Sequence, residues 1–459
     1  MIWTEAQAER QLRSLELFGM RFGLDRMRRM MTALGAPDGS KIGQPFDTVH
    51  VLGTNGKSST TRMTAAILEG HGLRTGAYLS PHLVSYRERV LVDGRELDRE
   101  AFAAAIGRAS WAAERVNRTL AEDDHVTQFE LLTAAALWEM ARQQVDVAVV
   151  EAGLGGRYDA TSVIDSQVTV LTNVGLEHTR WLGPTVKDIA EEKLAVVRPR
   201  TALVLADDLA APALAVAERI ARERGAWIVR PRPTPPSMQL LARGAFQRRN
   251  FALARAAAEA YLRTLGIGLD EQAVAHAAAR TEVPGRLQLV GEDPPTVLDG
   301  AHNPDAVAAL VEALPDVLPL AGTPSGAHPG GNTQAGAGRQ AGGEQPIALV
   351  LGVLEDKDAA GMLAALLPVV ERAWFTAPPS GRALSPAALQ SLARQLGFEA
   401  SASEPKPSRA LEHARRWAGE RGGAVLATGS VYLVGDLLGW LGRADSAPSA
   451  RAGRRSSSG

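Results

Sequence analysis

The sequence predicts an α/β protein with parallel-rich sheets, divided into a larger N-terminal and a smaller C-terminal domain. Short apolar runs rich in Val, Ile and Leu alternate with alanine-rich helical stretches, and the runs are continuous, as in strands covered on both faces. The alternation pauses at residues 284–295 and then restarts. The length of 459 residues fits two or three domains.

The expected elements follow from this alternation. In the first domain, residues 1–288, the strands are 48–52, 145–150, 168–172 and 202–206, and the helices are 60–70, 129–142 and 212–224. In the second domain, residues 289–442, the strands are 296–298, 347–353, 373–376 and 424–427, and the helices are 305–314, 359–367, 386–396, 408–421 and 431–441. An insertion at 321–345 and a tail at 443–459 carry too few large apolar residues to fold, so we expect both to be disordered.

Composition excludes several classes of protein. A net charge of −1 argues against a general nucleic-acid binder. The absence of cysteine excludes disulfides, thiol nucleophiles and iron–sulfur clusters, so any metal must be held by oxygen or imidazole. The longest apolar runs fall well short of the roughly 18 residues that span a bilayer. The charged N-terminus does not resemble a signal peptide. We therefore expect a cytoplasmic protein with no membrane partner.

The strongest local signal is TVHVLGTNGKSSTT, residues 48–61, in which a buried strand leads through a glycine turn into a helix. Backbone N–H groups at such a turn and a lysine beside the helix N-terminus are typical of phosphate binding. The usual P-loop has an additional glycine where this chain has Val51, so the loop is a shortened variant. The alternative is a plain strand–turn–helix junction.

A second motif is VAVVEAGLGGRYDATS, residues 147–162. Glu151 stands at the carboxyl end of a strand, where α/β sheets place ligand sites, and a carboxylate opposite a phosphate loop is the expected Mg²⁺ partner. The glycines that follow permit close approach of the backbone to a ligand. A purely structural turn fits these glycines equally well.

Three other candidates come from later motifs. His178 follows the strand at 168–172, and its alternative is an ordinary hydrogen-bonded histidine. Lys193 lies in AEEK, which is also typical of a solvated helix face. In TVLDGAHNP, Asp299 is placed to accept from a ribose hydroxyl, whereas Asn303 and Pro304 alone would make a helix N-cap.

Together these blocks resemble the folylpolyglutamate synthase/dihydrofolate synthase family of the Mur ligase superfamily, over residues 17–441. The motifs that carry the resemblance, in chain order, are HVLGTNGKSST, SPHLVSYRERV, EAGLGGRYDATS, TNVGLEHTRWLG with AEEKLA, PGR, LDGAHNP and GSVYLVGDL. The resemblance implies a P-loop-type ATPase domain followed by a smaller Rossmann-like domain. It also implies ATP-dependent addition of L-glutamate to dihydropteroate or a reduced folate through an acyl phosphate, by a monomer.

The resemblance further implies roles for individual residues. ATP would be bound by Gly56, Lys57, Ser58, Ser59, Asn250, Arg286 and Asp299; Mg²⁺ by Ser80, Glu151 and His178; and dihydropteroate by Thr127, Gln128, Phe129, Glu130, Tyr158, Asp159 and Ala160. Lys193 would be carbamylated and would act in catalysis with His178 and Glu151.

The sequence departs from the family pattern at a few positions. Ser58 replaces the second glycine of the usual Gly-Lys-Gly-Ser, Glu177 replaces an aspartate, and Leu-Ala-Val follows Lys193 in place of Ala-Gly-Ile. Two alternatives stay open. Another Mur-type amino-acid ligase is one, although too few residues precede the phosphate loop for an extra N-terminal domain. A nucleotide-binding module without catalysis is the other.

Overall fold

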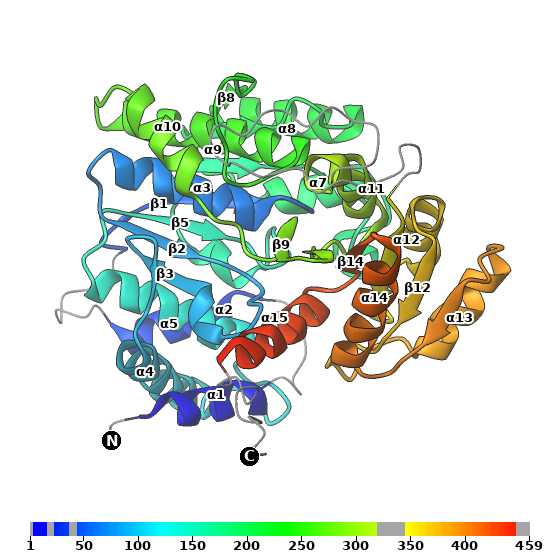
Figure 1. The fold of residues 1–459 in the computed structure, drawn as a ribbon. Coiled ribbons are helices and arrows are strands. Elements are labelled where there is room, and N and C mark those ends of the chain that lie inside the picture. Colours follow the sequence, from blue (N-terminus) through cyan, green and yellow to red (C-terminus); the bar gives the residue numbers. More distant parts are fainter. Residues whose placement is uncertain (1–2, 16–22, 36–43, 319–344, 447–459) are drawn as a thin grey trace, which may run out of the picture. The chain divides into compact units, whose positions relative to one another are not determined.

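The computed structural model describes residues 3–15, 23–35, 44–318 and 345–446 (Figure 1). The chain forms two compact units, Met1–Val283 and Pro284–Gly459, so the division lies a few residues before the predicted boundary at 288. Of the predicted insertion at 321–345, only Gln345 lies within the described residues. The prediction that the chain is disordered from residue 443 is wrong for its first residues, because the last helix continues to Ser446. Arg443 lies in the last turn of this helix, where a positive charge interacts favourably with the helix dipole. Residues 447–459 lie outside the described residues.

The N-terminal unit is built on an eight-stranded sheet with the order β4-β3-β2-β5-β1-β6-β7-β8. The strands are β1 (Asp47–Leu52), β2 (Thr75–Tyr78), β3 (Val90–Val92), β4 (Arg95–Glu96), β5 (Val147–Glu151), β6 (Val168–Leu171), β7 (Ala202–Leu205) and β8 (Trp227–Val229). Along the order β2-β5-β1-β6-β7-β8, each strand runs parallel to its neighbours. Strand β3 is antiparallel to both of its neighbours, β2 and β4. In the centre, Val49 is in register with Val149 on one side and with Val168 on the other.

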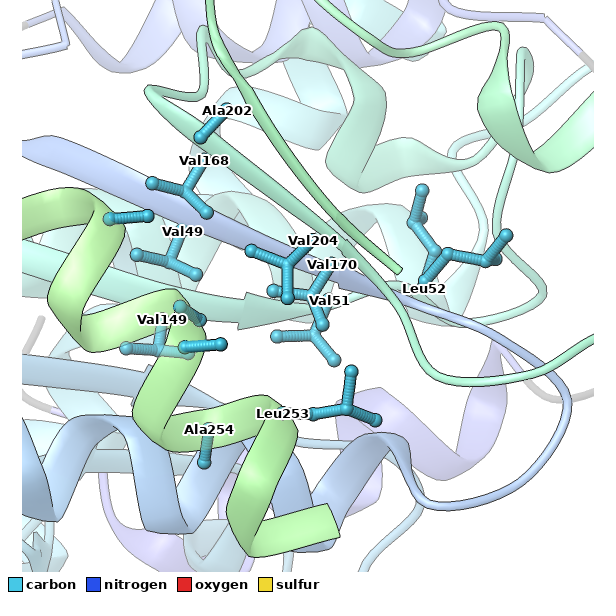
Figure 2. Packing of buried hydrophobic residues seen from close by; sticks show 14 of the residues in the cluster. Val49, Val51, Leu52, Val149, Val168, Val170, Ala202, Val204, Leu253 and Ala254 are labelled. Carbon is cyan, nitrogen blue, oxygen red and sulfur yellow. The ribbon is translucent and has the colours of Figure 1, made fainter. Parts of the chain in front are cut away.

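Helices cover both faces of this sheet. They are α1 (Glu5–Ser14), α2 (Asp25–Leu34), α3 (Lys57–Gly70), α4 (Arg99–Asn117), α5 (Gln128–Arg142), α6 (Thr179–Leu182), α7 (Val186–Leu194), α8 (Ala211–Arg224), α9 (Ala245–Thr264) and α10 (Glu271–Arg280), with short 3₁₀ turns η2 (Tyr86–Arg89) and η3 (Ala160–Val163). Successive residues of β5 enter different cores, because side chains alternate across a strand. Val149 packs with α3 and α7–α10, while Val150 packs with α1, α2, α4 and α5. Figure 2 shows the first of these cores.

The C-terminal unit has a six-stranded sheet with the order β13-β12-β11-β14-β10-β9, parallel except for β9. Its strands are β9 (Gln288–Glu292), β10 (Pro295–Leu298), β11 (Ile347–Leu351), β12 (Arg372–Phe375), β13 (Ser401–Ser403) and β14 (Ala424–Thr428). Its helices are α11 (Pro304–Ala313), α12 (Ala359–Leu366), α13 (Pro386–Gln395), α14 (Pro407–Arg421) and α15 (Val431–Ser446), with 3₁₀ turns η4 (Leu314–Asp316) and η5 (Leu367–Val369). Helix α14 packs on β11 and β14.

The predicted fold class is confirmed in both units. Every strand and helix expected from the sequence is present, with ends that differ by a few residues. The elements that the sequence did not reveal include the inner strand β2 and the short strands β3, β4, β8, β9 and β13. Among the described residues, no helix is both long and apolar enough to cross a bilayer.

Candidate active site

The phosphate loop connects β1 to α3 at the carboxyl edge of the larger sheet. Gly53 and Gly56 have φ values of 145° and 82°, in the region that favours glycine. A Cβ atom on Gly53 would overlap the Thr172 hydroxyl, and one on Gly56 would overlap the Asn250 side-chain oxygen. The loop therefore needs glycine at both positions for conformation and for space, and helix α3 begins immediately after it at Lys57.

Two residues after β6 brace this loop. The Asn173 side-chain oxygen accepts hydrogen bonds from the backbone N–H groups of Thr54 and Asn55, at 3.0 and 2.7 Å. The Thr172 hydroxyl donates to the Asn55 carbonyl at 2.6 Å. We assigned neither side chain a role from the sequence. The available signal was that two polar residues follow β6, the neighbour of β1, at the same edge of the sheet.

The first turn of α3 carries the predicted phosphate ligands. The Lys57 ammonium curls back over the loop and donates to the carbonyls of Gly53 and Thr54, each at 3.1 Å. The Ser58 hydroxyl, which occupies the usual position of a glycine, donates to Glu151 Oε1 at 3.0 Å. The Ser58 side chain is therefore directed toward the Glu151 carboxylate. The next residue, Ser59, is buried.

Glu151 is the buried acid at the end of β5, with 1% of its surface exposed. Its second oxygen, Oε2, accepts from the backbone N–H of Ser80 at 3.0 Å. The structure therefore brings together Glu151, Ser58 and Ser80 from three separate parts of the sequence. Carboxylate and hydroxyl oxygens are donors that suit Mg²⁺, so these residues fit the expected ion.

His178, which was predicted in the same metal site, follows β6 and contacts the neighbouring residue Glu177. It has a left-handed backbone with φ 52° and precedes α6, and its Nε2 lies 3.6 Å from Glu177 Oε1. Within the described parts of the chain, no three His, Asp or Glu side chains gather into a metal-binding group. A divalent ion here would depend on few protein ligands, with phosphate and water oxygens completing its shell.

Lys193 on α7 is buried, with 3% exposure, so the alternative of a solvated helix face is wrong. Its ammonium donates to the Leu154 carbonyl at 2.6 Å and to the Gly53 carbonyl at 3.1 Å. Burial, reinforced by the nearby charge of Lys57, lowers the pKa of Lys193 to about 7. A lysine with this pKa is partly a neutral amine near neutral pH, which is the nucleophilic form.

The glycine loop after Glu151 is held by Asp159. Asp159 Oδ2 accepts from the backbone N–H groups of Leu154 and Gly155 at 2.9 and 3.0 Å. Asp159 Oδ1 accepts from the Thr161 hydroxyl at 2.6 Å. Asp159, which was predicted to bind substrate, therefore links the loop that supplies the Leu154 carbonyl to Lys193, through Oδ2, with Thr161 of η3, through Oδ1.

A buried histidine completes this bracing. The Thr161 hydroxyl lies 2.9 Å from His50 Nε2. Since that hydroxyl already donates to Asp159, it must accept from His50, which places the proton of the neutral imidazole on Nε2. Burial lowers the pKa of His50 to about 4. The sequence did not reveal His50, because an isolated histidine in an apolar strand carries no pattern.

Residues 127–130, predicted to bind substrate, form the start of α5. Thr127 is its N-cap and makes a reciprocal capping box with Glu130, whose carboxylate also accepts from Arg26 Nε at 3.1 Å. Gln128 Nε2 donates to the Leu12 carbonyl at 3.0 Å. The Phe129 ring lies against the glycine loop, since a Cβ atom on Gly153 would meet it at 2.6 Å. The polar groups of Thr127 and Glu130 thus stabilise the helix start.

The other predicted dihydropteroate residues follow the glycine loop. Tyr158 is 47% exposed, whereas Ala160 is buried and begins η3. The ring of Phe129 also lies 6.1 Å from that of Tyr78. Phe129 and Tyr158 are therefore the aromatic residues of this set that lie beside the loop.

The remaining predicted nucleotide contacts divide between the two units. In the N-terminal unit, Asn250 on α9 lies beside Gly56, and its Nδ2 donates to Gln247 at 3.0 Å. In the C-terminal unit, both oxygens of buried Asp299 accept from backbone N–H groups, those of Leu287 at 2.8 Å and Ala301 at 2.7 Å. Burial raises the pKa of Asp299.

The neighbours of Asp299 have structural contacts as well. Arg286 donates to the Gly285 carbonyl at 3.0 Å and lies so close to Gly300 that a Cβ there would overlap it. Asn303 is the N-cap of α11 and accepts from the Ala306 N–H at 2.8 Å, with Pro304 at the first helical position. The N-cap reading of Asn303 and Pro304 is thereby confirmed.

Comparison with known proteins agrees with this architecture. Residues 51–223 match the Mur ligase middle domain. The chain is 33% identical over 371 residues to the dihydrofolate synthase/folylpolyglutamate synthase of Escherichia coli, covering 78% of each chain, and 31% identical to the folylpolyglutamate synthase of Lacticaseibacillus casei, covering 84% of that protein. It also spans about half, 49%, of a longer probable bifunctional folylpolyglutamate synthase/dihydropteroate synthase of Haloferax volcanii.

Solved structures give the same result. The Mycobacterium tuberculosis folylpolyglutamate synthase complexed with ADP and AMPPCP superposes with a TM-score of 0.82 at 28% identity, covering 96% of this chain and 99% of that one. The E. coli FolC protein in complex with DHPP and ADP gives 0.76 at 29% identity, covering 96% and 98%. The fold, the loop between β1 and α3 and these comparisons together show that the chain is a Mur ligase. More narrowly, the chain belongs to the folylpolyglutamate synthase/dihydrofolate synthase family.

Proposed function

We propose that this protein is an ATP-dependent ligase that joins L-glutamate to the carboxylate of dihydropteroate, of a reduced folyl-glutamate, or of both. The observation that carries the proposal is the assembly of Ser58, the Ser80 N–H and buried Glu151 beside a phosphate loop. The names of the relatives, which include both synthase activities, support the substrate class.

The reaction proceeds in two balanced steps. An acceptor carboxylate oxygen attacks the γ-phosphorus of ATP, and the bond to the bridging oxygen breaks to release ADP. The amine of glutamate then attacks the carbonyl carbon of the acyl phosphate, loses a proton and expels phosphate as the amide forms. A carboxylate is a poor electrophile, so phosphorylation supplies its leaving group. The protein contributes positioning and neutralisation of charge.

We assign the protein's part in these steps to named groups. Lys57 and the N–H groups at the start of α3, with Gly56, Ser58 and Ser59, bind the phosphates. Glu151, Ser80 and His178 hold Mg²⁺, which when bound neutralises phosphate charge. Asn250, Arg286 and Asp299 contact the nucleotide. Phe129 and Tyr158 offer aromatic faces to a flat pterin or aminobenzoate ring.

Lys193 takes part as a carbamate. Its neutral amine adds to the carbon of CO₂ and loses one proton, so that a buried cation becomes an anion near the metal site. The lowered pKa of Lys193 supports this reaction, because only the unprotonated amine can attack. The carbamate would then help to hold the metal and orient the acceptor.

The test is phosphate release by the purified protein with ATP, Mg²⁺, glutamate and each acceptor. We expect release to require both glutamate and acceptor and to be lost in Lys57→Ala. Release without glutamate would contradict a ligase. Another Mur-type ligase is the second candidate, and turnover with a different carboxylate but neither pterin acceptor would favour it. A monomeric state and a cytoplasmic location stay predictions, tested by light scattering and cell fractionation.

A further inference from the structure

A cavity of about 410 Å³ lies between β8 and α9 in the N-terminal unit, and nothing in the proposed reaction uses it. We call it the α9–β8 groove. Its chemically distinctive lining residues are Trp227, Arg230, Arg232, Arg255, Glu259 and Arg263. Four guanidinium groups thus face one carboxylate in a chain whose net charge is only −1.

Two of these arginines are available for a ligand. Arg232 and Arg263 are exposed, and within the described part of the chain neither side chain makes a hydrogen bond or ion pair. Arg255 is 14% exposed and pairs with Glu271, yet its Nε atom is buried without a hydrogen-bond partner. Arg230 donates to the Ala206 carbonyl at 2.9 Å. A buried guanidinium N–H without an acceptor is costly, so this groove favours an anionic ligand.

Two of the guanidinium groups lie on one face of α9. Arg255 and Arg263 are eight residues apart, about 12 Å along the helix axis, with the carboxylate of Glu259 between them. Arg230 and Arg232 directly follow β8, at the carboxyl edge where the phosphate loop follows β1. The groove therefore begins at the reactive edge of the sheet and continues away from it.

We propose that the α9–β8 groove binds the oligo-γ-glutamate tail of the acceptor or product. This rests on the proposed function, in which each cycle adds one residue carrying another free carboxylate. Guanidinium groups spaced along two sides of a groove, from α9 and from the residues after β8, suit several carboxylates on one flexible chain. A single phosphate group is better bound by N–H groups converging on one point, as at the phosphate loop.

The experiment measures binding of γ-linked pentaglutamate to the full chain, without ATP or acceptor, by isothermal titration calorimetry. We expect Arg232→Gln/Arg263→Gln to weaken binding about 5- to 10-fold. Arg232→Lys/Arg263→Lys should retain most of the affinity because it keeps both charges. The matched control is Arg28→Gln/Arg118→Gln, which removes two exposed arginines associated with α2 and α4, on the opposite face of the sheet, and should leave affinity unchanged.

Lys57→Ala removes a proposed phosphate ligand of the active site and no residue that lines the groove. It should therefore also leave pentaglutamate affinity unchanged. Unchanged affinity in the Arg232→Gln/Arg263→Gln protein would overturn the proposal. Equal affinity for inorganic tripolyphosphate and pentaglutamate would also overturn it, as it would indicate a general anion site. Because binding is measured without ATP or acceptor, failure here is distinguishable from failure of the proposed ligase reaction.

Discussion

Replacement of buried Lys193 by arginine should abolish turnover although the charge is kept. With a pKa of about 7, roughly half of the Lys193 side chains are neutral amines at pH 7. A lysine at its ordinary pKa would be neutral in only about 0.03% of molecules, so burial together with the charge of Lys57 raises the reactive fraction by about a thousandfold. Arginine stays protonated and cannot form the carbamate. We therefore expect the kcat of Lys193→Arg to fall at least about 100-fold.

The assay follows ADP release at saturating substrates, in buffers depleted of CO₂ and then supplemented with bicarbonate. Wild-type kcat should rise as the pH increases through about 7 and should increase with bicarbonate. Lys187→Arg, on the exposed side of the same helix, is the matched control and should behave as wild type. Wild-type turnover in Lys193→Arg would refute the carbamate and leave Lys193 with a structural role.

The same pKa predicts how stability depends on pH. The folded pKa of Lys193 lies below its ordinary value, so between pH 7 and 10.5 the unfolded state binds more protons than the native state. The free energy of unfolding should therefore rise with pH across this window, by at most ~5 kcal/mol from this group. Urea titrations of wild type and Lys193→Met should show a shallower rise in the variant; equal slopes would contradict the lowered pKa.

Three other substitutions or deletions test the remaining parts. Thr161→Val removes the hydroxyl that contacts both His50 and Asp159, so the free energy of unfolding, measured by urea titration, should fall by about 1–3 kcal/mol. An unchanged free energy would show that these two hydrogen bonds do not stabilise the fold. Glu151→Gln should lower kcat by about 100-fold and raise the Mg²⁺ concentration needed, and normal Mg²⁺ dependence would remove Glu151 from the metal site. Deleting residues 322–344 should cost less than about 2 kcal/mol, because loop length has a weak entropic effect.

The sequence predicted the central strands better than the edges. Runs such as residues 147–150 of β5 are buried on both faces and therefore apolar, which is a strong signal. Trp227–Val229 is a three-residue edge strand, partly exposed, and is too short to carry a period. The position of Glu151 at a strand end likewise predicted a carboxylate opposite the loop after β1, and the structure places it in contact with Ser58.

Contacts across long sequence separations could not be predicted. The AEEK sequence is typical of an exposed helix face, whereas the carbonyls of Gly53 and Leu154 accept hydrogen bonds from the buried Lys193 ammonium. The roles of Asn173 and His50 depend in the same way on partners more than a hundred residues away. For Asp159, the family resemblance predicts substrate binding, and the structure adds that its carboxylate joins the glycine loop to Thr161.

The most direct test of the proposed ligase uses acceptors labelled with ¹⁸O in the carboxylate. Dihydropteroate and a reduced folyl-monoglutamate are supplied separately with ATP, Mg²⁺ and glutamate, and the released phosphate is analysed by mass spectrometry. Transfer of one ¹⁸O atom to phosphate for each amide formed, with either or both acceptors, is the expected result, because the labelled oxygen bonds to phosphorus before it leaves. Amide formation with unlabelled phosphate, or no amide with either acceptor, would contradict it.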